Sequence, residues 1–555
     1  MLDVIIKNGR IVDGSGLPGY FGDVGIKDGK IVKTGDVSEA ATTVIDATGR
    51  VVAPGFIDPH THFDAQLLWD GCARPAMEHG VTTIVPGNCS LSLAPLKAEH
   101  RPKLVGMFNQ IEEMPIRAFE EGIEWTWESF PEFVSRIKQG LAINVAPLVG
   151  HSVLRLWVMG DAAMERTATD SEITEMQDLL RECLDAGAIG LSTSFVDMDE
   201  KLQPVPSRYA AASEVDALSE VLGEYGRILQ IVNEFYDADL TIARIDQLAE
   251  ISLKHKITTT FSPLFVNNGE FKAVDKTMAR VKEQFARGAR VWPQVQTRPI
   301  DISFSFAVPS LLFIRLPTWY GIMRFGSHDE IVAAFKDADK REKMTAEASA
   351  MGPLWSMLIL RQVNTEANQP LVGKSLEEIA QLRNCTPLDA MIDLSLEEDL
   401  DAHFLAGNMG HNDDAKVSGL LADPNVHIGA SDGGAHILSF STYGDTGYLF
   451  AHFVRETGLI NLEAAVKKIT SDTASIWCIP DRGLLKAGFV ADVTIFDPET
   501  IDRGQEYYVQ DVPGEGSRYV RDAVGVDTVL VAGHVAYSAA DGYSDTPRGS
   551  ILPGA

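Results

Sequence analysis

The sequence has few cysteines, no long apolar run and no block of basic residues. Its five cysteines are Cys72, Cys89, Cys183, Cys385 and Cys478, and no two of them form a CxxC pair. This spacing excludes a disulfide framework and a zinc site made of cysteines alone, so a functional cysteine would act singly. No stretch approaches about 18 uninterrupted apolar residues, and the start, MLDVIIKNGRIVDGSG, has no basic segment followed by a long apolar one. We therefore expect a cytoplasmic protein.

Positive charge is also scarce, because 48 Lys and Arg face 78 Asp and Glu, for a formal net charge of -30. Nucleic acids and anionic membranes are bound by positive fields, which this composition does not supply. We expect a small-molecule substrate, with no nucleic-acid partner and no membrane partner, and self-association into a homo-oligomer is left open. The 555 residues, 45% of them hydrophobic, are enough for a large core and more than one domain.

The two ends of the chain share one pattern of short β-rich runs separated by turns. Asn8-Gly9 and Asp28-Gly29 are hairpin signals, since these pairs tolerate positive φ at both central turn positions. Short strands need partners that bury one face. The pattern predicts a small β-sandwich domain built from residues 1–50 and 483–545.

Between the ends, apolar strand-like runs alternate with longer helical stretches, such as DSEITEMQDLLRECLDAG with Gly187 at its end. We place eight such runs: VAPGFIDPH, VTTIVPGN, INVAPLVGH, AIGLSTSF, RILQIVNE, TTTFSPLF, RVWPQVQTR and VHIGASDG. Eight buried strands with intervening helices predict an α/β fold, a TIM-like (β/α)8 barrel over residues 51–482. A doubly wound sheet would show the same periodicity. In the barrel, the active site lies at the carboxyl ends of the strands.

One interval is far longer than an ordinary connection. About 125 residues, from about 300 to 425, separate the seventh and eighth runs. SHDEIVAAFKDADKREKMTAEASAM inside it has a helical pattern. We predict an inserted, mostly helical segment, which either covers the barrel mouth or packs on the outside.

Four residues at predicted strand ends carry ligand atoms. His60 and His62, in GFIDPHTHFDAQ, are two residues apart, so an extended strand points both imidazoles to one side. Cys89, in GNCS after the second run, offers a thiolate, and Asp432, in GASDGG after the eighth, offers a carboxylate. Such a set can hold a divalent cation, with Asp432 as general base on a water that the metal activates. Each residue also has an ordinary structural interpretation, as a polar strand end, a buried thiol or a turn cap.

GASDGG also matches G-x-S-x-G, which offers Ser431 as a nucleophile with His436 or His452 as base. A nucleophile elbow is followed by a helix and then by an acid and a histidine on later strand ends. Only about 120 residues remain here, and many belong to the predicted β domain, so the metal interpretation is favoured.

These residues, in this order, resemble the amidohydrolase superfamily, and within it the N-acyl-D-amino-acid deacylase group. The matching stretches include NGRIVDGSG, APGFIDPHTHFDAQ, HGVTTIVPGNCS, ASDGGAH and DRGLLKAGFVADVTIFDPET. The resemblance implies a β/α barrel with a β sandwich and an inserted segment, and hydrolysis of an amide by a metal-activated water. It makes His60 and His62 the first ligand pair and Cys89 the metal-binding cysteine, where other relatives use a carboxylated lysine. Asp432 then binds metal and accepts the proton of the attacking water.

The resemblance breaks at the fifth and sixth strands. The deacylases have a histidine where this chain has Gln230, and a histidine and a lysine where it has Pro263 and Phe265. Proline has no ligand atom, and glutamine is a weak neutral ligand. We therefore predict one divalent metal per chain, zinc in the first instance, held by His60, His62, Cys89 and Asp432 with Gln230 as a further ligand.

Further candidates follow from position. His151 in VGHS is a candidate for polarising the scissile carbonyl, Arg298 in QTRP for an anion clamp, and Glu234 and His436 for substrate contacts. The leading function is a metal-dependent hydrolase that cleaves the amide C–N bond of an N-acylated amino acid or related small molecule. The alternatives are the same scaffold acting on a lactone, a cyclic amide or a C–C bond next to a carbonyl, and a serine hydrolase that uses Ser431.

Overall fold

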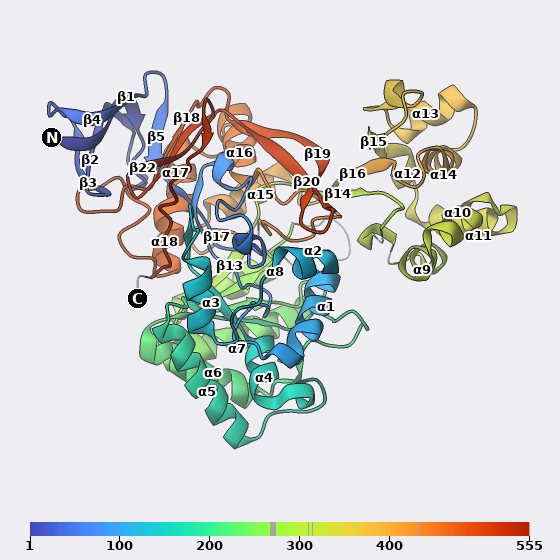
Figure 1. Ribbon diagram of the computed structural model, residues 1–555, viewed down its shortest axis with the longest axis horizontal. Coiled ribbons are helices and arrows are strands. Elements are labelled where there is room, and N and C mark those ends of the chain that lie inside the picture. The colour runs from blue at the N-terminus through green and yellow to red at the C-terminus, as the bar shows by residue number, and fades with distance from the viewer. Residues whose placement is uncertain (267–273, 309, 314, 430, 554–555) are drawn as a thin grey trace.

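The computed structural model describes residues 1–553 except 267–273, 309, 314 and 430. Three bodies of structure are visible in Figure 1: a sheet built from both ends of the chain, a central barrel ringed by helices, and an insertion that projects to one side. Among the described residues no helix is both long enough and apolar enough to cross a membrane. The cytoplasmic location and the homo-oligomer stay predictions.

The eight predicted strands are present and parallel. The barrel strands are β6 (Phe56–Asp58), β7 (Val81–Ile84), β8 (Asn144–Val145) continued by β9 (Leu148–Gly150), β10 (Gly190–Ser194), β11 (Ile228–Val232), β12 (Thr259–Ser262), β13 (Val291–Val295) and β17 (His427–Ile428). Pairing runs β6-β7-β8 in one sheet and β17-β13-β12-β11-β10-β9 in the other. A parallel bridge between Thr61 and Gly433 joins the two outer strands, β6 and β17. The fold is that of a TIM-like barrel, and not of a doubly wound sheet. Ala430, inside the eighth predicted run, lies outside the described residues.

Helices follow the strands and cover the barrel. They include α1 (Arg101–Ile111), α3 (Phe130–Ile137), α4 (His151–Met159), α5 (Asp170–Asp185), α6 (Ala212–Tyr225), α7 (Ala238–His255), α8 (Val274–Ala286) and α15 (Asp414–Ala422). The predicted helix before Gly187 is α5, which begins with a capping box between Thr169 and Glu172. Gly187 has φ of 108°, a left-handed conformation that ends the helix without steric cost.

Both chain ends build one nine-stranded sheet, seen in Figure 1 as blue strands beside red ones. Its strands are β1 (Leu2–Ile11), β2 (Tyr20–Lys27), β3 (Lys30–Gly35), β4 (Ala41–Asp46), β5 (Val51–Pro54), β18 (Val493–Phe496), β21 (Val526–Val531), β22 (His534–Ser538) and β23 (Gly542–Tyr543). The sheet thus extends to Pro54, beyond the expected boundary at residue 50, because β5 pairs with β1 and β18. The domain limits in the sequence remain predictions.

One of the two hairpin signals is wrong. Asp28 and Gly29 form the turn between β2 and β3, with φ of 50° and 73°. Asn8 and Gly9 instead lie inside β1, where the register with β2 is irregular. A β-carbon on Gly9 would come within 2.4 Å of the Val52 side chain, so the glycine serves a bulge packed closely against β5.

The long interval forms an insertion with its own core. It contains β14 (Ile300–Phe304), α9 (Pro317–Phe325), α10 (His328–Lys336), α11 (Ala338–Ala348), α12 (Leu354–Met357), β15 (Ile359–Gln362), α13 (Leu376–Arg383), α14 (Pro387–Glu397) and β16 (His403–Gly410). Its aromatic side chains, among them Phe306, Phe313 and Trp319, pack together in a separate hydrophobic cluster. Arg324 on α9 donates to Gln110 Oε1 on α1 at 2.7 Å, which ties the insertion to the barrel rim.

Candidate metal centre

Four ligand atoms from three parts of the chain meet at the carboxyl ends of the barrel strands. His60 and His62 follow β6 and are each 1% exposed. Cys89 Sγ lies 3.5 Å from His60 Nε2 and 3.6 Å from His62 Nε2. Asp432 Oδ1, after β17, lies 3.1 Å from His60 Nε2 and 3.8 Å from His62 Nε2. The four residues predicted as ligands are therefore neighbours, although nearly 350 residues separate Cys89 from Asp432.

The spacing of His60, His62 and Cys89 suits a tetrahedral cation, because their ligand atoms lie within 4.8 Å of one another. Bonds of about 2.0 Å to nitrogen and 2.3 Å to sulfur at a tetrahedral zinc separate nitrogen from sulfur by about 3.5 Å. The two sulfur-to-nitrogen distances match this value. Two imidazoles, a thiolate and a carboxylate are also the donor types that zinc accepts. The residues present therefore fit a zinc ion.

Two residues that the sequence analysis missed lie beside the imidazoles. Gln294 Oε1, on β13, lies 2.8 Å from His60 Nδ1, and Glu112 Oε1, after α1, lies 3.0 Å from His62 Nδ1. The Gln294 acceptor fixes the proton on His60 Nδ1 and leaves its Nε2 lone pair for a metal. Glu112 lies at ion-pair distance from His62 Nδ1, but the two atoms form no hydrogen bond. A polar residue inside the otherwise buried β13 was a signal for Gln294. Glu112 follows a helix and carries no comparable signal in the sequence.

Burial and neighbouring charges set the protonation of the site. Burial lowers the pKa of His60 to about 4, so its imidazole is neutral at pH 7 and able to bind a cation. Burial raises the pKa of Glu112 to about 8, and it also raises the pKa of the Cys89 thiol well above its usual value. Burial also acts to raise the pKa of Asp432, but the imidazoles of His60, His436 and His62 outweigh it and lower that pKa. Asp432 is thus ionised, and a cation held here would favour the deprotonated thiol of Cys89.

The backbone is strained at two of the four ligands. Cys89 has φ of 55° and Asp432 has φ of 59°, which are left-handed conformations for residues with a β-carbon. Such conformations cost of order 1–3 kcal/mol each and are concentrated at functional sites. The flanking Gly433 and Gly434 let this loop pass close to His62 and Phe63.

Arg298, predicted as an anion clamp, holds the Asp432 loop. Its Nε donates to Asp445 Oδ2 at 2.8 Å, and one terminal nitrogen donates to the Ser431 carbonyl at 2.9 Å. Thr297 binds the other oxygen of Asp445 through both its backbone N–H and its hydroxyl. Arg298 is only 4% exposed, so these protein contacts take up much of its hydrogen-bonding capacity.

Two other predicted residues, His151 and Glu234, have structural partners. His151 is fully buried, with Nε2 2.8 Å from Glu214 and Nδ1 3.0 Å from Thr193. Glu234 forms an ion pair with Arg244 at 2.7 Å. Both ring nitrogens of His151 are therefore occupied, and the structure does not bring His151 or Glu234 to the four ligand atoms.

Gln230 on β11 is fully buried. Its Nε2 donates to the Ile231 carbonyl at 2.9 Å and to Ser262 Oγ at 3.3 Å, and its Oε1 has no partner among the described residues. The amide is thus bound to the neighbouring strand and not to the two histidines. Its role as a ligand stays a prediction.

The partners of the Ser431 hydroxyl are the Asp58 carboxylate and the His60 backbone carbonyl, and no imidazole binds it among the described residues. The hydroxyl donates to Asp58 Oδ2 at 2.7 Å, while His452 pairs with Asp414 and Glu456 elsewhere on the surface. His436 stacks on Phe440, and its Nδ1 is buried without a partner among the described residues. The His436 imidazole is one of the groups that lower the pKa of Asp432.

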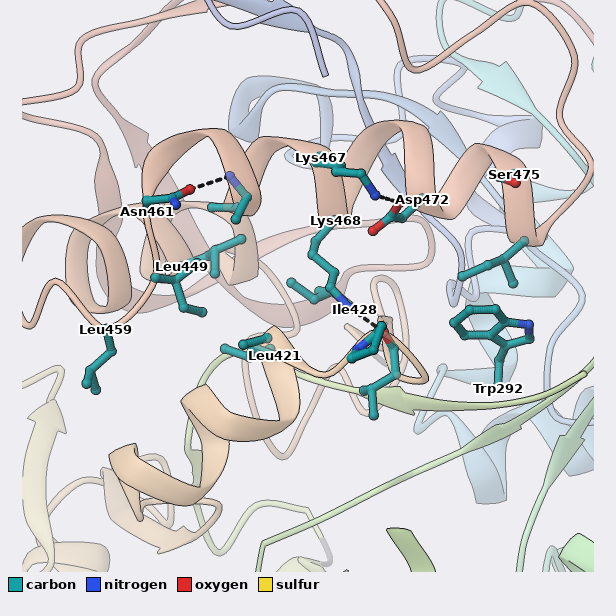
Figure 2. A pocket seen from close by; sticks show the side chains of 17 residues that line it. Trp292, Leu421, Ile428, Leu449, Leu459, Asn461, Lys467, Lys468, Asp472 and Ser475 are labelled. Carbon is teal, nitrogen blue, oxygen red and sulfur yellow. Dashed lines mark hydrogen bonds and ion pairs between the residues drawn. The ribbon is translucent and has the colours of Figure 1, made fainter. Parts of the chain in front are cut away.

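A separate cavity of about 440 Å³ lies on the outside of the barrel, between α15, β17 and the helical segment 445–476. Figure 2 shows Lys468 reaching from this segment to the loop before β17, where its ammonium donates to the carbonyls of Asp423 and Val426. These bonds anchor the helix to the loop. The residues that line this cavity include none of the candidate ligands.

Comparison with known proteins gives one family. The model for "Amidohydrolase family" matches residues 43–252 and 339–537. The chain is 29% identical to a D-aminoacylase of Alcaligenes xylosoxydans xylosoxydans, over 90% of this chain and 89% of that protein. Its structure superposes with a TM-score of 0.68 and 25% identity on N-acyl-D-glutamate deacylase from Bordetella bronchiseptica, complexed with zinc and a phosphonate mimic of the tetrahedral intermediate, with 99% of each chain covered. A D-aminoacylase whose binuclear metal centre shows one-metal activation and second-metal attenuation superposes equally well, with 26% identity and 99% of each chain covered.

Proposed function

The chain belongs to the amidohydrolase family, and from this premise we propose that it binds one zinc ion through His60, His62, Cys89 and Asp432 and hydrolyses the amide C–N bond of an N-acylated amino acid or a related small molecule. The observation that carries this proposal is the convergence of His60, His62 and Cys89, whose ligand atoms lie within 4.8 Å of one another, with Asp432 Oδ1 3.1 Å and 3.8 Å from the two Nε2 atoms. The one-metal activation of the D-aminoacylase relative supports a single ion.

Each protein group has a defined part in the proposed reaction. A divalent cation held here supplies Lewis-acid activation of the carbonyl and of water. Asp432, ionised and adjacent to both Nε2 atoms, accepts the proton of the attacking water and then returns it to the departing nitrogen. His436, with its free Nδ1, donates to the oxyanion that develops on the carbonyl. Arg298 and Asp445 keep the Asp432 loop in position.

The different-bond alternative keeps this scaffold and rests on Gln230, Pro263 and Phe265. Pro263 and Phe265 line an apolar cavity at the end of β12, so this side of the barrel mouth presents no ligand atom from either side chain. A lactone, a cyclic amide or a ketone also has a carbonyl carbon that a water deprotonated by Asp432 could attack. Assay of these compounds beside N-acyl amino acids decides between the two.

Separate substitutions test the mechanism. Asp432→Asn removes the base while keeping the side-chain shape, and kcat should fall at least about 100-fold. Ser431→Ala removes one hydroxyl that binds Asp58, and kcat should fall less than about tenfold. An equal loss in the two variants would favour a serine nucleophile and contradict the proposal. Metal analysis of each variant checks that zinc is retained, because Asp432 is also a proposed ligand.

A further inference from the structure

A small apolar cavity opens at the ends of β11 and β12. Its volume is about 170 Å³, and its walls include Phe235, Phe261, Pro263, Leu264, Phe265 and Val266. The Phe265 ring lies edge-on to Phe235 and to His411, with ring centroids 6.0 Å and 6.2 Å away. An apolar cavity of about 150 Å³ is large enough to hold a benzene ring.

The cavity selects against charge. Each described residue that lines it has an uncharged side chain. A carboxylate placed there would lose its hydration without meeting a cation among the described residues that line the cavity. An uncharged apolar group enters such a space favourably because it leaves water.

Three polar side chains line the otherwise apolar wall: Asn233, Thr241 and Thr277. Asn233 is 1% exposed, and its Oδ1 accepts the backbone N–H of Glu234 at 2.8 Å. That bond identifies which amide atom is oxygen, so the other is the Nδ2 donor group. Asn233 Nδ2 has no partner among the described residues, although it is buried. A buried donor without a partner is unfavourable, and an acceptor on a ligand would satisfy it.

We propose that this cavity is the substrate subsite for an uncharged apolar or aromatic group that carries a carbonyl oxygen, with Asn233 Nδ2 donating to that oxygen. The inference rests on the proposed function and deepens it by naming the substrate class: N-acyl compounds whose group next to the cavity has no free carboxylate. The cavity lies at the same end of the barrel as the metal centre, because Asn233 and Pro263 directly follow β11 and β12 just as Asp432 follows β17.

Benzamide, a neutral aromatic ring with one carbonyl, is the probe, and benzoate is its anionic counterpart. Titration calorimetry of the zinc-loaded protein should show benzamide binding at least about tenfold more tightly than benzoate. Asn233→Asp keeps the acceptor for Glu234 N–H but removes the donor, and it should weaken benzamide about tenfold. Asn412→Asp, at an exposed asparagine outside the cavity, adds the same charge and should leave benzamide binding unchanged. Equal binding of the two probes, or an unaffected Asn233→Asp protein, would overturn the proposal.

A second variant covers the case in which Asn233→Asp does not fold. Phe235 is 43% exposed, so Phe235→Ala removes one wall of the cavity without emptying a core, and benzamide should again weaken. Benzamide should also inhibit hydrolysis competitively; non-competitive inhibition, or none, would show that the cavity is no subsite of the active site. A protein that hydrolyses no N-acyl compound but still binds benzamide through Asn233 would refute the proposed function and leave the cavity's preference established.

Discussion

The close contact between the Glu112 carboxylate and the His62 imidazole gives a sharp test of the metal centre. Glu112 is 1% exposed, and its Oε1 lies 3.0 Å from His62 Nδ1. Glu112→Gln keeps a carbonyl oxygen at this position but removes the negative charge that makes His62 a stronger ligand. Changing a partner of a metal-binding imidazole typically weakens metal binding about 10- to 100-fold, which corresponds to about 1.4–2.7 kcal/mol. Zinc affinity should therefore fall about tenfold, at the lower end of the range for such partners of metal ligands.

The pKa of Glu112 makes the prediction depend on pH in a defined direction. Burial raises that pKa to about 8 in the metal-free protein. Above pH 8 the wild-type carboxylate is already ionised and its advantage over glutamine is complete. Below pH 8 zinc must first displace the proton, so the advantage shrinks by up to tenfold for each pH unit. Competition with a chromophoric chelator at pH 8.5 and pH 6.5 measures both affinities.

Glu113 supplies the matched control. Its carboxylate accepts the backbone N–H of Leu438 at 3.1 Å and the hydroxyl of Ser439, and these bonds hold a loop and not a metal ligand. Glu113→Gln should leave zinc affinity close to that of the wild type at both pH values. Equal losses in the two variants, or no loss in Glu112→Gln, would refute the role given to Glu112.

Two further predictions concern Cys89 and His411. Because the thiol pKa of Cys89 is raised, zinc binding should release a proton, and zinc affinity should rise by up to about tenfold per pH unit between pH 6 and pH 8. The Cys89→Ser protein should bind zinc weakly and with a flatter pH dependence. Equal pH slopes of zinc affinity in the wild type and the variant would argue against Cys89 as a ligand. Burial lowers the pKa of His411 to about 4, below its usual 6.5, so the neutral ring stabilises the fold above pH 6.5 and this stability is lost as pH falls towards 4. Between pH 7 and pH 5 the wild type should lose about 2 kcal/mol of unfolding free energy through His411. Urea unfolding of the wild type and of His411→Gln measures this, because the difference in unfolding free energy between them should shrink by that amount. A difference that stays constant with pH would contradict the assigned pKa.

The alternation of apolar runs and helical stretches was enough to predict the barrel, and local turn chemistry was not always enough to place a hairpin. Parallel strands buried on both faces read as short apolar runs whatever their neighbours are. Asn8-Gly9 has the composition of a type I′ turn, yet β1 continues through it, because Val52 on β5 packs where a β-carbon would be. That contact joins residues far apart in the sequence, so propensity did not reveal it.

For the candidate ligands, too, the sequence predicts the positions and the structure supplies the neighbours. The sequence by itself determined that His60, His62, Cys89 and Asp432 follow strands, because strand ends and residue types are local properties, and the barrel topology then places such ends together. Only the tertiary structure decided which neighbours each ligand meets: Gln294 and Glu112 on the two imidazoles, and Asp58 on Ser431. It also showed that His151 and Arg298 form hydrogen bonds with other protein groups. The buried Nδ2 donor of Asn233 has no partner in the part of the chain that the structure describes. These outcomes depend on distances of about 3 Å between residues that lie up to several hundred positions apart, and such contacts exist only once the core has packed.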